Sequence, residues 1–250
     1  MEDCPIGFDE WCLIIEFLSN ADLFRWIQCN SICFALAQRE LTKRKWRKDG
    51  LFLLAEKGDL DGVRFWVEDG ADVHANDDEA LRLASMNGQL EVVKYIVEEC
   101  GADMHADDDS ALQLASMNGH LKVVRYLVEG GGANVHANCE SALGWASREG
   151  HIDIVRYLVE KGEADVHARN EQALRWASWY GHLKIVRYLV EECGANVRNW
   201  ALRQASGRGH LEVVQYLVKC GADVHSRSDA ALQWAIRNRH KKVVKFLRMQ

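Results

Sequence analysis

The histidines are the residues of this chain whose type and spacing most invite a chemical interpretation. All ten lie in the register of a repeat of about 30 residues. Two series account for nine of them: His74, His105, His136, His167 and His225, then His120, His151, His182 and His210. Imidazole is a common zinc ligand, but zinc needs every ligand nitrogen at about 2 Å, whereas neighbouring helical layers lie roughly 8–10 Å apart. We therefore expect histidines that hydrogen-bond neighbouring loops, and no metal site.

Other candidate chemical groups are sparse. Asp107, Asp108 and Asp109 could attract a cation, but three adjacent acids between helices are also typical of a solvated loop tip, which we expect here. The sequence has no glycine-rich phosphate loop, no serine nucleophile elbow and no H-E-x-x-H motif. It therefore predicts no catalytic residue, no cofactor and no enzyme activity.

Cysteine usage and hydropathy indicate the compartment. The eight cysteines include no C-x-x-C pair, and Cys100, Cys193 and Cys220 occupy equivalent positions of the repeat. Scattered cysteines of this kind are typical of reduced thiols in an intracellular protein. The longest apolar runs, such as WCLII at 11–15, fall short of the roughly 18 residues that span a bilayer. The first residues, MEDCP, carry no basic-then-apolar signal. We expect a cytoplasmic protein without membrane contact.

Charge is distributed unevenly along the chain. The net charge is −6, but residues 51–110 carry 16 acids and 4 bases, a local −12, whereas residues 173–250 carry 5 acids and 14 bases, a local +9. Such polarity can orient an approaching partner. A nucleic-acid partner is not predicted, because the net charge is negative and aromatic–basic stacking motifs are absent.

The elements that position these groups are internal repeats. A frame A-L-x-x-A-S-x-x-G-H-L-x-V-V-x-Y-L-V begins at Ala80, Ala111, Ala142, Ala173, Ala201 and Ala231, with a degenerate copy at Leu51. Its apolar spacing predicts a short helix and a longer one, which end at glycines such as Gly88 and Gly101. Between units lies a polar segment, the finger, such as ADVHANDDE at 71–79. Because neither helix can bury its apolar face alone, neighbouring units must stack.

This unit resembles the ankyrin repeat. The resemblance is carried by the second helix, GHLKVVRYLV at 119–128, and by the finger base, GADVHS at 221–226. It covers about residues 51–250 and implies an all-α solenoid of about seven units over 49–250, preceded by a small helical module over 1–48. The usual T-P-L-H opening is absent, and the finger at 195–200 has lost about three more residues, which predicts a gap or kink there. This variant of the repeat sequence is similar to ankyrin arrays of large DNA viruses of single-celled hosts, and the similarity implies that the protein acts in the host cytoplasm.

Three positions of the first helix vary while the frame persists. The fourth position is Leu83, Leu114, Trp145, Trp176, Gln204 and Trp234 in the successive copies. The seventh and eighth are Met86-Asn87, Met117-Asn118, Arg148-Glu149, Trp179-Tyr180, Gly207-Arg208 and Arg237-Asn238. A buried position would not accept Trp, Gly and Arg alike, so we expect the seventh and eighth to be partly exposed; the fourth could also be half core. In ankyrin arrays this edge lines the concave surface, so the resemblance implies a protein target bound there. The candidate binding residues are Trp145, Arg148, Trp176, Trp179, Tyr180, Arg208 and Trp234.

Residues 8–37 lie outside the repeat and contain two amphipathic helical stretches. They resemble an F-box, with Ile14, Phe17, Leu18 and Leu23 as the residues that would contact an adaptor, although Leu-Pro is displaced to Pro5-Ile6. The resemblance implies that the Skp-type subunit of a cullin–RING ubiquitin ligase binds there. The alternative is a helical cap on the first repeat, in a monomeric ankyrin scaffold or competitive binding protein without a ligase.

Overall fold

In a computed structural model of the protein, residues 40–197 and 199–250 are described. Every regular element among them is a helix, so the predicted all-α class is confirmed. The adaptor residues Ile14, Phe17, Leu18 and Leu23 lie outside the described residues, and the F-box interpretation stays a prediction.

The described helices group into two compact units, the first comprising residues 40–84 with 89–103. It contains α4 (Glu40–Lys57), α5 (Leu60–Glu68), most of α6 (Ala75–Met86) and α7 (Leu90–Glu98). The degenerate copy that begins at Leu51 comprises the C-terminal end of α4 together with α5, and Leu51, Leu54 and Ala55 are buried. The expected domain boundary between residues 48 and 49 thus lies inside a continuous helix.

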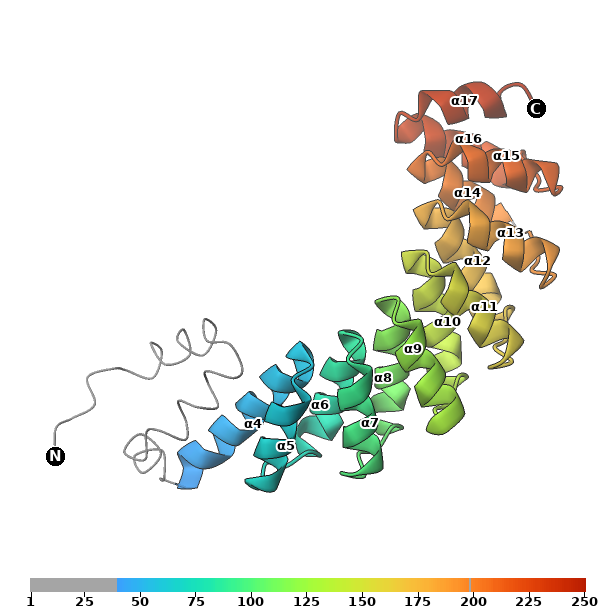
Figure 1. The fold of residues 1–250 in the computed structure, drawn as a ribbon. Coiled ribbons are helices and arrows are strands. Elements are labelled where there is room, and N and C mark those ends of the chain that lie inside the picture. Colours follow the sequence, from blue (N-terminus) through green and yellow to red (C-terminus); the bar gives the residue numbers. More distant parts are fainter. Residues whose placement is uncertain (1–39, 198) are drawn as a thin grey trace, which may run out of the picture. The chain divides into compact units, whose positions relative to one another are not determined.

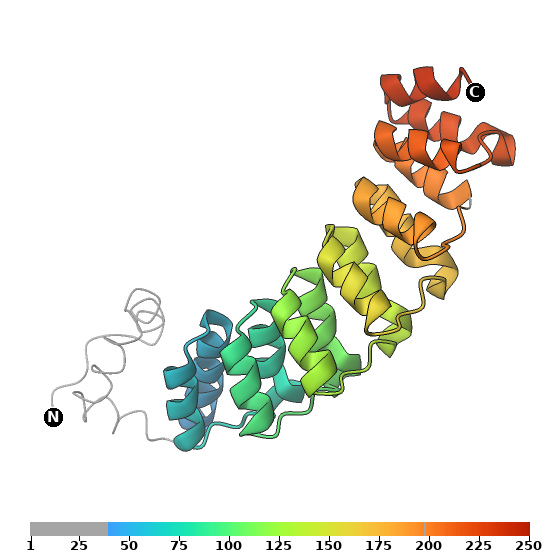
Figure 2. The same cartoon turned by 45° about the vertical axis from the view of Figure 1, so that its right-hand side comes forward.

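The second unit comprises residues 85–88 and 104–250. Its first helices are α8 (Ala106–Met117), α10 (Ala137–Glu149), α12 (Ala168–Tyr180), α14 (Asn199–Arg208) and α16 (Ser226–Arg237). Its second helices are α9 (Leu121–Arg125) with the π-helix η1 (Tyr126–Gly130), α11 (Ile152–Glu160), α13 (Leu183–Glu191), α15 (Leu211–Lys219) and α17 (Lys241–Leu247). These helix pairs follow one another in chain order (Figures 1 and 2).

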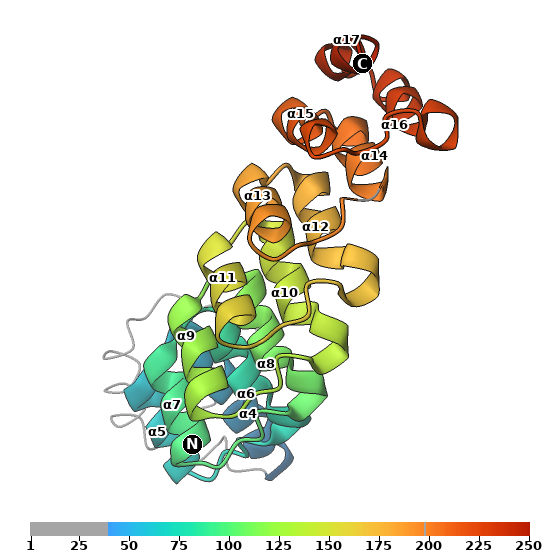
Figure 3. The same cartoon turned by 90° about the vertical axis from the view of Figure 1, so that its right-hand side faces the viewer.

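First helices pack on first helices and second helices on second helices, so the second unit has two layers (Figure 3). The invariant apolar residues of the frame fill the space between them: in the copy at Ala142, the residues Leu143, Ala146, Ile154 and Leu158 are all almost completely buried. A fully buried Leu or Ile side chain contributes about 1.5–3 kcal/mol relative to an exposed one. Each repeat therefore depends on the neighbouring repeats for its core, as the repeat pattern predicts.

A glycine–histidine clamp joins consecutive first helices. Gly150 ends α10 with a left-handed φ of 91°, and the imidazole of His182, from the next repeat, lies against it. A Cβ on Gly150 would approach the Cε1 of His182 to 2.7 Å. The His182 Nε2 donates to the carbonyl oxygen of Arg148 at 2.8 Å. The same arrangement pairs Gly88 with His120, Gly119 with His151, Gly181 with His210 and Gly209 with His240.

The fingers contain a left-handed turn that the sequence did not suggest. Three consecutive non-glycine residues have φ between 48° and 65° in each of five fingers: 76–78, 107–109, 138–140, 169–171 and 227–229. L-residues resist this conformation at roughly 1–2 kcal/mol each. The turn is held by the other histidine series, because its third residue is an acid that accepts a hydrogen bond of 2.6–3.0 Å from the Nδ1 of the histidine four residues earlier.

Asp109 shows how hydrogen bonds offset the cost of the left-handed turn. Its carboxylate accepts hydrogen bonds from His105 Nδ1 at 3.0 Å and from the backbone N–H of Asn134, in the next finger, at 2.8 Å. Asp107 and Asp108 are exposed, but Asp109 is buried at 4% exposure. The expectation of a fully solvated tip at 107–109 is therefore wrong for Asp109, which is buried and accepts hydrogen bonds from its own finger and from the next one.

Candidate functional site

Two tryptophans pair across consecutive first helices. Trp145 on α10 and Trp176 on α12 have ring centroids 5.2 Å apart, with planes tilted by 51°. The Arg148 guanidinium lies 5.0 Å from the Trp145 centroid and 5.3 Å from that of Tyr180. Its Nε donates a 3.0 Å hydrogen bond to the Tyr180 hydroxyl. Four side chains that the sequence singled out therefore form one cluster.

The cluster continues to α14. The guanidinium of Arg208 lies 4.1 Å from the ring centroid of Trp179. Tyr180 is 41% exposed, Arg208 is exposed, and Trp179 is half-buried. We call these six residues the aromatic–arginine patch: Trp145, Arg148, Trp176, Trp179, Tyr180 and Arg208.

The backbone below the patch is fixed by two glycine–histidine clamps. His182 binds the carbonyl of Arg148, and His210 binds that of Trp179 at 2.9 Å. Burial lowers the pKa of His210, and its hydrogen bond to Trp179 only partly opposes this shift. A neutral imidazole with its proton on Nε2 fits the clamp, since the carbonyl accepts that proton.

Trp234, the seventh predicted binding residue, belongs to a different group of side chains. Its ring lies 4.9 Å from the guanidinium of Arg203, and its Cε3 would be 2.7 Å from a Cβ on Gly207. Gly207 is buried. The expectation that every seventh position is partly exposed is therefore wrong at Gly207, where glycine makes room for the indole of the next unit.

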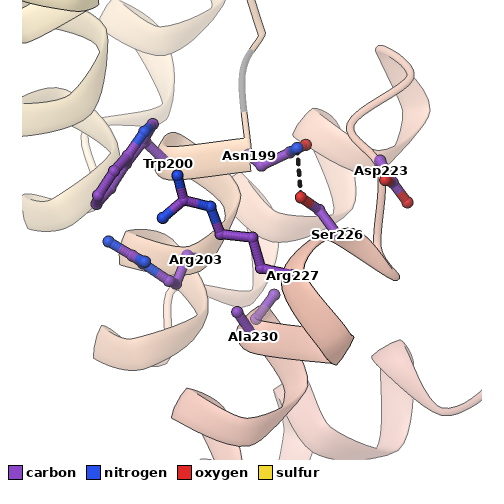
Figure 4. A pocket seen from close by; sticks show the side chains of 8 residues that line it. Asn199, Trp200, Arg203, Asp223, Ser226, Arg227 and Ala230 are labelled. Atoms are coloured by element: carbon purple, nitrogen blue, oxygen red, sulfur yellow. Dashed lines mark hydrogen bonds between the residues drawn. The ribbon is translucent and has the colours of Figure 1, made fainter.

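A second set of groups lines a hollow between α14 and α16, which we call the α14–α16 hollow. It is lined by Asn199, Trp200, Arg203, Asp223, Ser226, Arg227, Ala230 and Ala231. The guanidinium of Arg203 lies 3.9 Å from the Trp200 ring centroid, and that of Arg227 lies 4.9 Å from it. Figure 4 shows both side chains directed toward Trp200 from two helices. The Trp200 side chain is 41% exposed.

Sequence reasoning missed this hollow, although its signal was present. The signal is the finger at 195–200, which is about three residues shorter than the others and from which only a gap or kink was predicted. Burial, together with the nearby charge of Arg227, lowers the pKa of Arg203. Like charges are therefore held close together without a carboxylate between them.

No three His, Cys, Asp or Glu side chains within 40–197 and 199–250 lie where they could hold one metal ion. In the same part of the chain, no helix is both long and apolar enough to cross a bilayer. The thiols of Cys100, Cys139, Cys193 and Cys220 are free, and burial raises the pKa of Cys100 and Cys193. Thiols of raised pKa are poor nucleophiles.

Comparisons with known proteins agree with this architecture. A family model described as "Ankyrin repeats (3 copies)" matches residues 51–139, 131–200 and 197–250. The crystal structure of the human ASB11 ankyrin repeat domain is similar at 22% sequence identity, with a TM-score of 0.66, covering 79% of this chain and 96% of that one. No curated protein sequence matches the chain.

Proposed function

The chain belongs to the ankyrin repeat family, whose repeats are protein-interaction scaffolds, and from this premise we propose that it binds a protein target through the aromatic–arginine patch. The observation that carries the proposal is the contiguous set of contacts among Trp145, Arg148, Trp176 and Tyr180 on adjacent helices. Protein interfaces concentrate their binding energy in Trp, Tyr and Arg side chains of this kind. The function is binding without catalysis or cofactor.

The patch is ordered before a partner arrives. Arg148 is held by the Tyr180 hydroxyl and by an ion pair with Glu149 at 3.3 Å, and Trp179 is covered by Arg208. Side chains already fixed in one rotamer lose less conformational entropy on binding. The exposed ring of Tyr180 supplies apolar area that a partner would bury.

The test replaces two adjacent residues of the patch, Trp179→Ala with Tyr180→Ala, in the full chain. Truncating interface hot spots costs about 2 kcal/mol or more, so target capture should weaken about 30-fold. The thermal midpoint should move little, because the lost cation–π contacts contribute only about 0.5–1 kcal/mol each. The matched control is Met117→Ala with Asn118→Ala, at the same two positions of α8, which should leave capture intact. A large loss of thermal stability with capture preserved would place Trp179 in the core and refute the proposal.

We further propose that residues 8–37 recruit the Skp-type subunit of a cullin–RING ubiquitin ligase, so that the bound target is ubiquitinated. The support is the F-box-like order of Ile14, Phe17, Leu18 and Leu23 in the sequence. Leu18→Ala with Leu23→Ala should abolish co-purification of that subunit while target capture survives. If the wild-type chain never recovers the subunit, the alternative holds: a scaffold or competitive binder with an N-terminal cap. Because the repeat sequence is similar to that of viral ankyrin arrays, the proposed target is a host protein in the cytoplasm.

A further inference from the structure

The shortened finger leaves one arginine of the frame without its usual hydrogen-bond partner. From the finger alanine to the first alanine of the next frame is nine positions in most copies, as from Ala164 to Ala173, but six from Ala195 to Ala201. The missing residues are those that form the left-handed turn elsewhere. Helix α14 begins directly at Asn199, so the described residues of this finger form neither a left-handed turn nor a histidine–carboxylate pair.

In four of the five complete fingers, the side chain of the third frame residue binds that turn. Arg175 donates from Nη1 to the carbonyl of Arg169 at 3.3 Å, and Gln233 donates from Nε2 to that of Ser228 at 2.7 Å. Arg82 and Gln113 donate to the carbonyls of Asn76 and Asp108 in the same way.

Arg203 occupies this third position, and its acceptor has been deleted. Its guanidinium forms no hydrogen bond or ion pair with any described residue. Its Nε is buried without a partner, as is that of Arg175, so the difference from Arg175 lies in the terminal nitrogens. Its planar face lies against Trp200 at 3.9 Å and Trp234 at 4.9 Å. Stacking of this kind leaves the N–H groups at the edge of the guanidinium directed away from the rings.

Arg227 brings a second unpaired guanidinium to the same indole. It is the first residue of the left-handed turn in α16. The equivalent Arg169 donates to the Asn138 side chain at 2.9 Å, whereas Arg227 has no such partner among the described residues and lies 4.9 Å from the Trp200 ring. The one acid of the lining, Asp223, accepts the backbone N–H of His225 at 2.9 Å and pairs with neither arginine.

We propose that the α14–α16 hollow binds the carboxylate of an Asp or Glu side chain in an acidic segment of the protein target, with the neighbouring apolar side chain of that segment on Trp200. The proposal rests on the proposed protein-binding function and names the chemistry of the partner. Two converging guanidiniums bind carboxylate oxygens through charge-assisted hydrogen bonds. The local charge of +9 over residues 173–250 attracts an acidic segment.

A single carboxylate fits better than a polyanion. The lining residues carry a net charge of +1, from Arg203, Arg227 and Asp223, which one carboxylate neutralises and a phosphate dianion would overcompensate. The net charge of −6 disfavours a nucleic-acid backbone.

Natural substitutions within the array supply variants that should fold. Gln stands at the third frame position in the copies at Ala111 and Ala231, and Asn stands at the first position of the left-handed turn as Asn76 and Asn138. The test variant is therefore Arg203→Gln with Arg227→Asn. The control, Arg175→Gln with Arg169→Asn, makes the same two changes at the equivalent frame and turn positions of α12 and removes the same net charge, but from arginines that already have partners.

The experiment selects phage-displayed random dodecapeptides on the full chain, then measures synthetic copies of the enriched peptides by fluorescence anisotropy. We expect enrichment of an Asp or Glu beside an apolar residue. The affinity should fall about 10-fold or more in the test variant and less than about 2-fold in the control, and Glu→Gln in the peptide should reproduce the loss.

Four results would overturn the proposal: no acidic enrichment, equal losses in both variants, tighter binding when phosphoserine replaces Glu, or displacement of the peptide by a second copy of this chain. Because the full chain also presents the aromatic–arginine patch to the library, each enriched peptide is also measured against the patch variant. Trp179→Ala with Tyr180→Ala should leave peptide binding unchanged, so failure of the proposed function and failure of this site give different results.

Discussion

Substituting Gly150 by alanine tests how the glycine–histidine clamp holds the helix that carries Arg148. The backbone at this position has a φ of 91°, and a Cβ there costs about 1–2 kcal/mol in the left-handed region. The same Cβ would sit 2.7 Å from the imidazole of His182, so the ring must move and its 2.8 Å bond to the Arg148 carbonyl is lost. That hydrogen bond contributes about 0.5–1.5 kcal/mol. We therefore expect Gly150→Ala to destabilise the array by about 1.5–3.5 kcal/mol.

Gly194→Ala separates the two contributions. Gly194 has a φ of 72°, and nothing lies within 4 Å of the Cβ that would be added. This variant should show only the backbone cost of about 1–2 kcal/mol. In a double-mutant cycle with His182→Ala, the cost of Gly150→Ala should fall toward the Gly194→Ala value, because the clash no longer exists.

The measurement is urea unfolding of the full chain followed by far-UV circular dichroism, with free energies taken from the shifts in midpoint at a common slope. Equal destabilisation by Gly150→Ala and Gly194→Ala would refute the clamp. So would a cycle in which the two changes at Gly150 and His182 are simply additive.

The remaining predictions concern pH and the core. Burial lowers the pKa of His210 in the folded chain below its ordinary value of about 6.5. Between these two pKa values the unfolded chain binds the proton and the folded chain does not. The free energy of unfolding should therefore fall as the pH drops below about 6.5. His210→Gln should reduce this loss between about pH 7.5 and pH 5.5, since Gln89 already replaces histidine in one clamp and donates to the Glu56 carbonyl; an unchanged pH dependence of the melting temperature would exclude His210 as its source. Ala146→Asp places a charge at a fully buried site and should abolish cooperative unfolding of the neighbouring units or cost several kcal/mol, whereas unaltered thermal stability would contradict the stacking described here.

The helices and their order could be predicted from the sequence because their signals are local. The frame places Leu143 and Ala146 on one face by helical periodicity alone, and both are buried. Glycine at position 150 indicates a helix end for a reason internal to one residue, its tolerance of positive φ. The variable positions also predicted that Arg148 and Tyr180 would be at least partly exposed, and both are.

The finger could not be predicted because its conformation depends on distant partners. Asp107 to Asp109 are unfavourable in the left-handed region one by one, and the turn persists because Asp109 binds His105 and the backbone of Asn134. The α14–α16 hollow escaped prediction for a related reason. Arg203 differs from Arg175 in lacking the finger carbonyl that accepts its hydrogen bond. The sequence shows that the finger is short, but it does not show which side chain loses its partner.

The glycine–histidine clamp also bears on how the number of units can change. Each of the copies that begin at Ala111, Ala142, Ala173 and Ala201 offers a glycine to its successor and a histidine to its predecessor, as Gly119 does to His151 and His120 to Gly88. A duplication or deletion of one of these copies therefore recreates a complete clamp at the new junction, whichever of the four is affected. The array can change length by recombination between copies without a compensating substitution elsewhere, and the aromatic and arginine residues of a binding face can be duplicated or discarded in the same step.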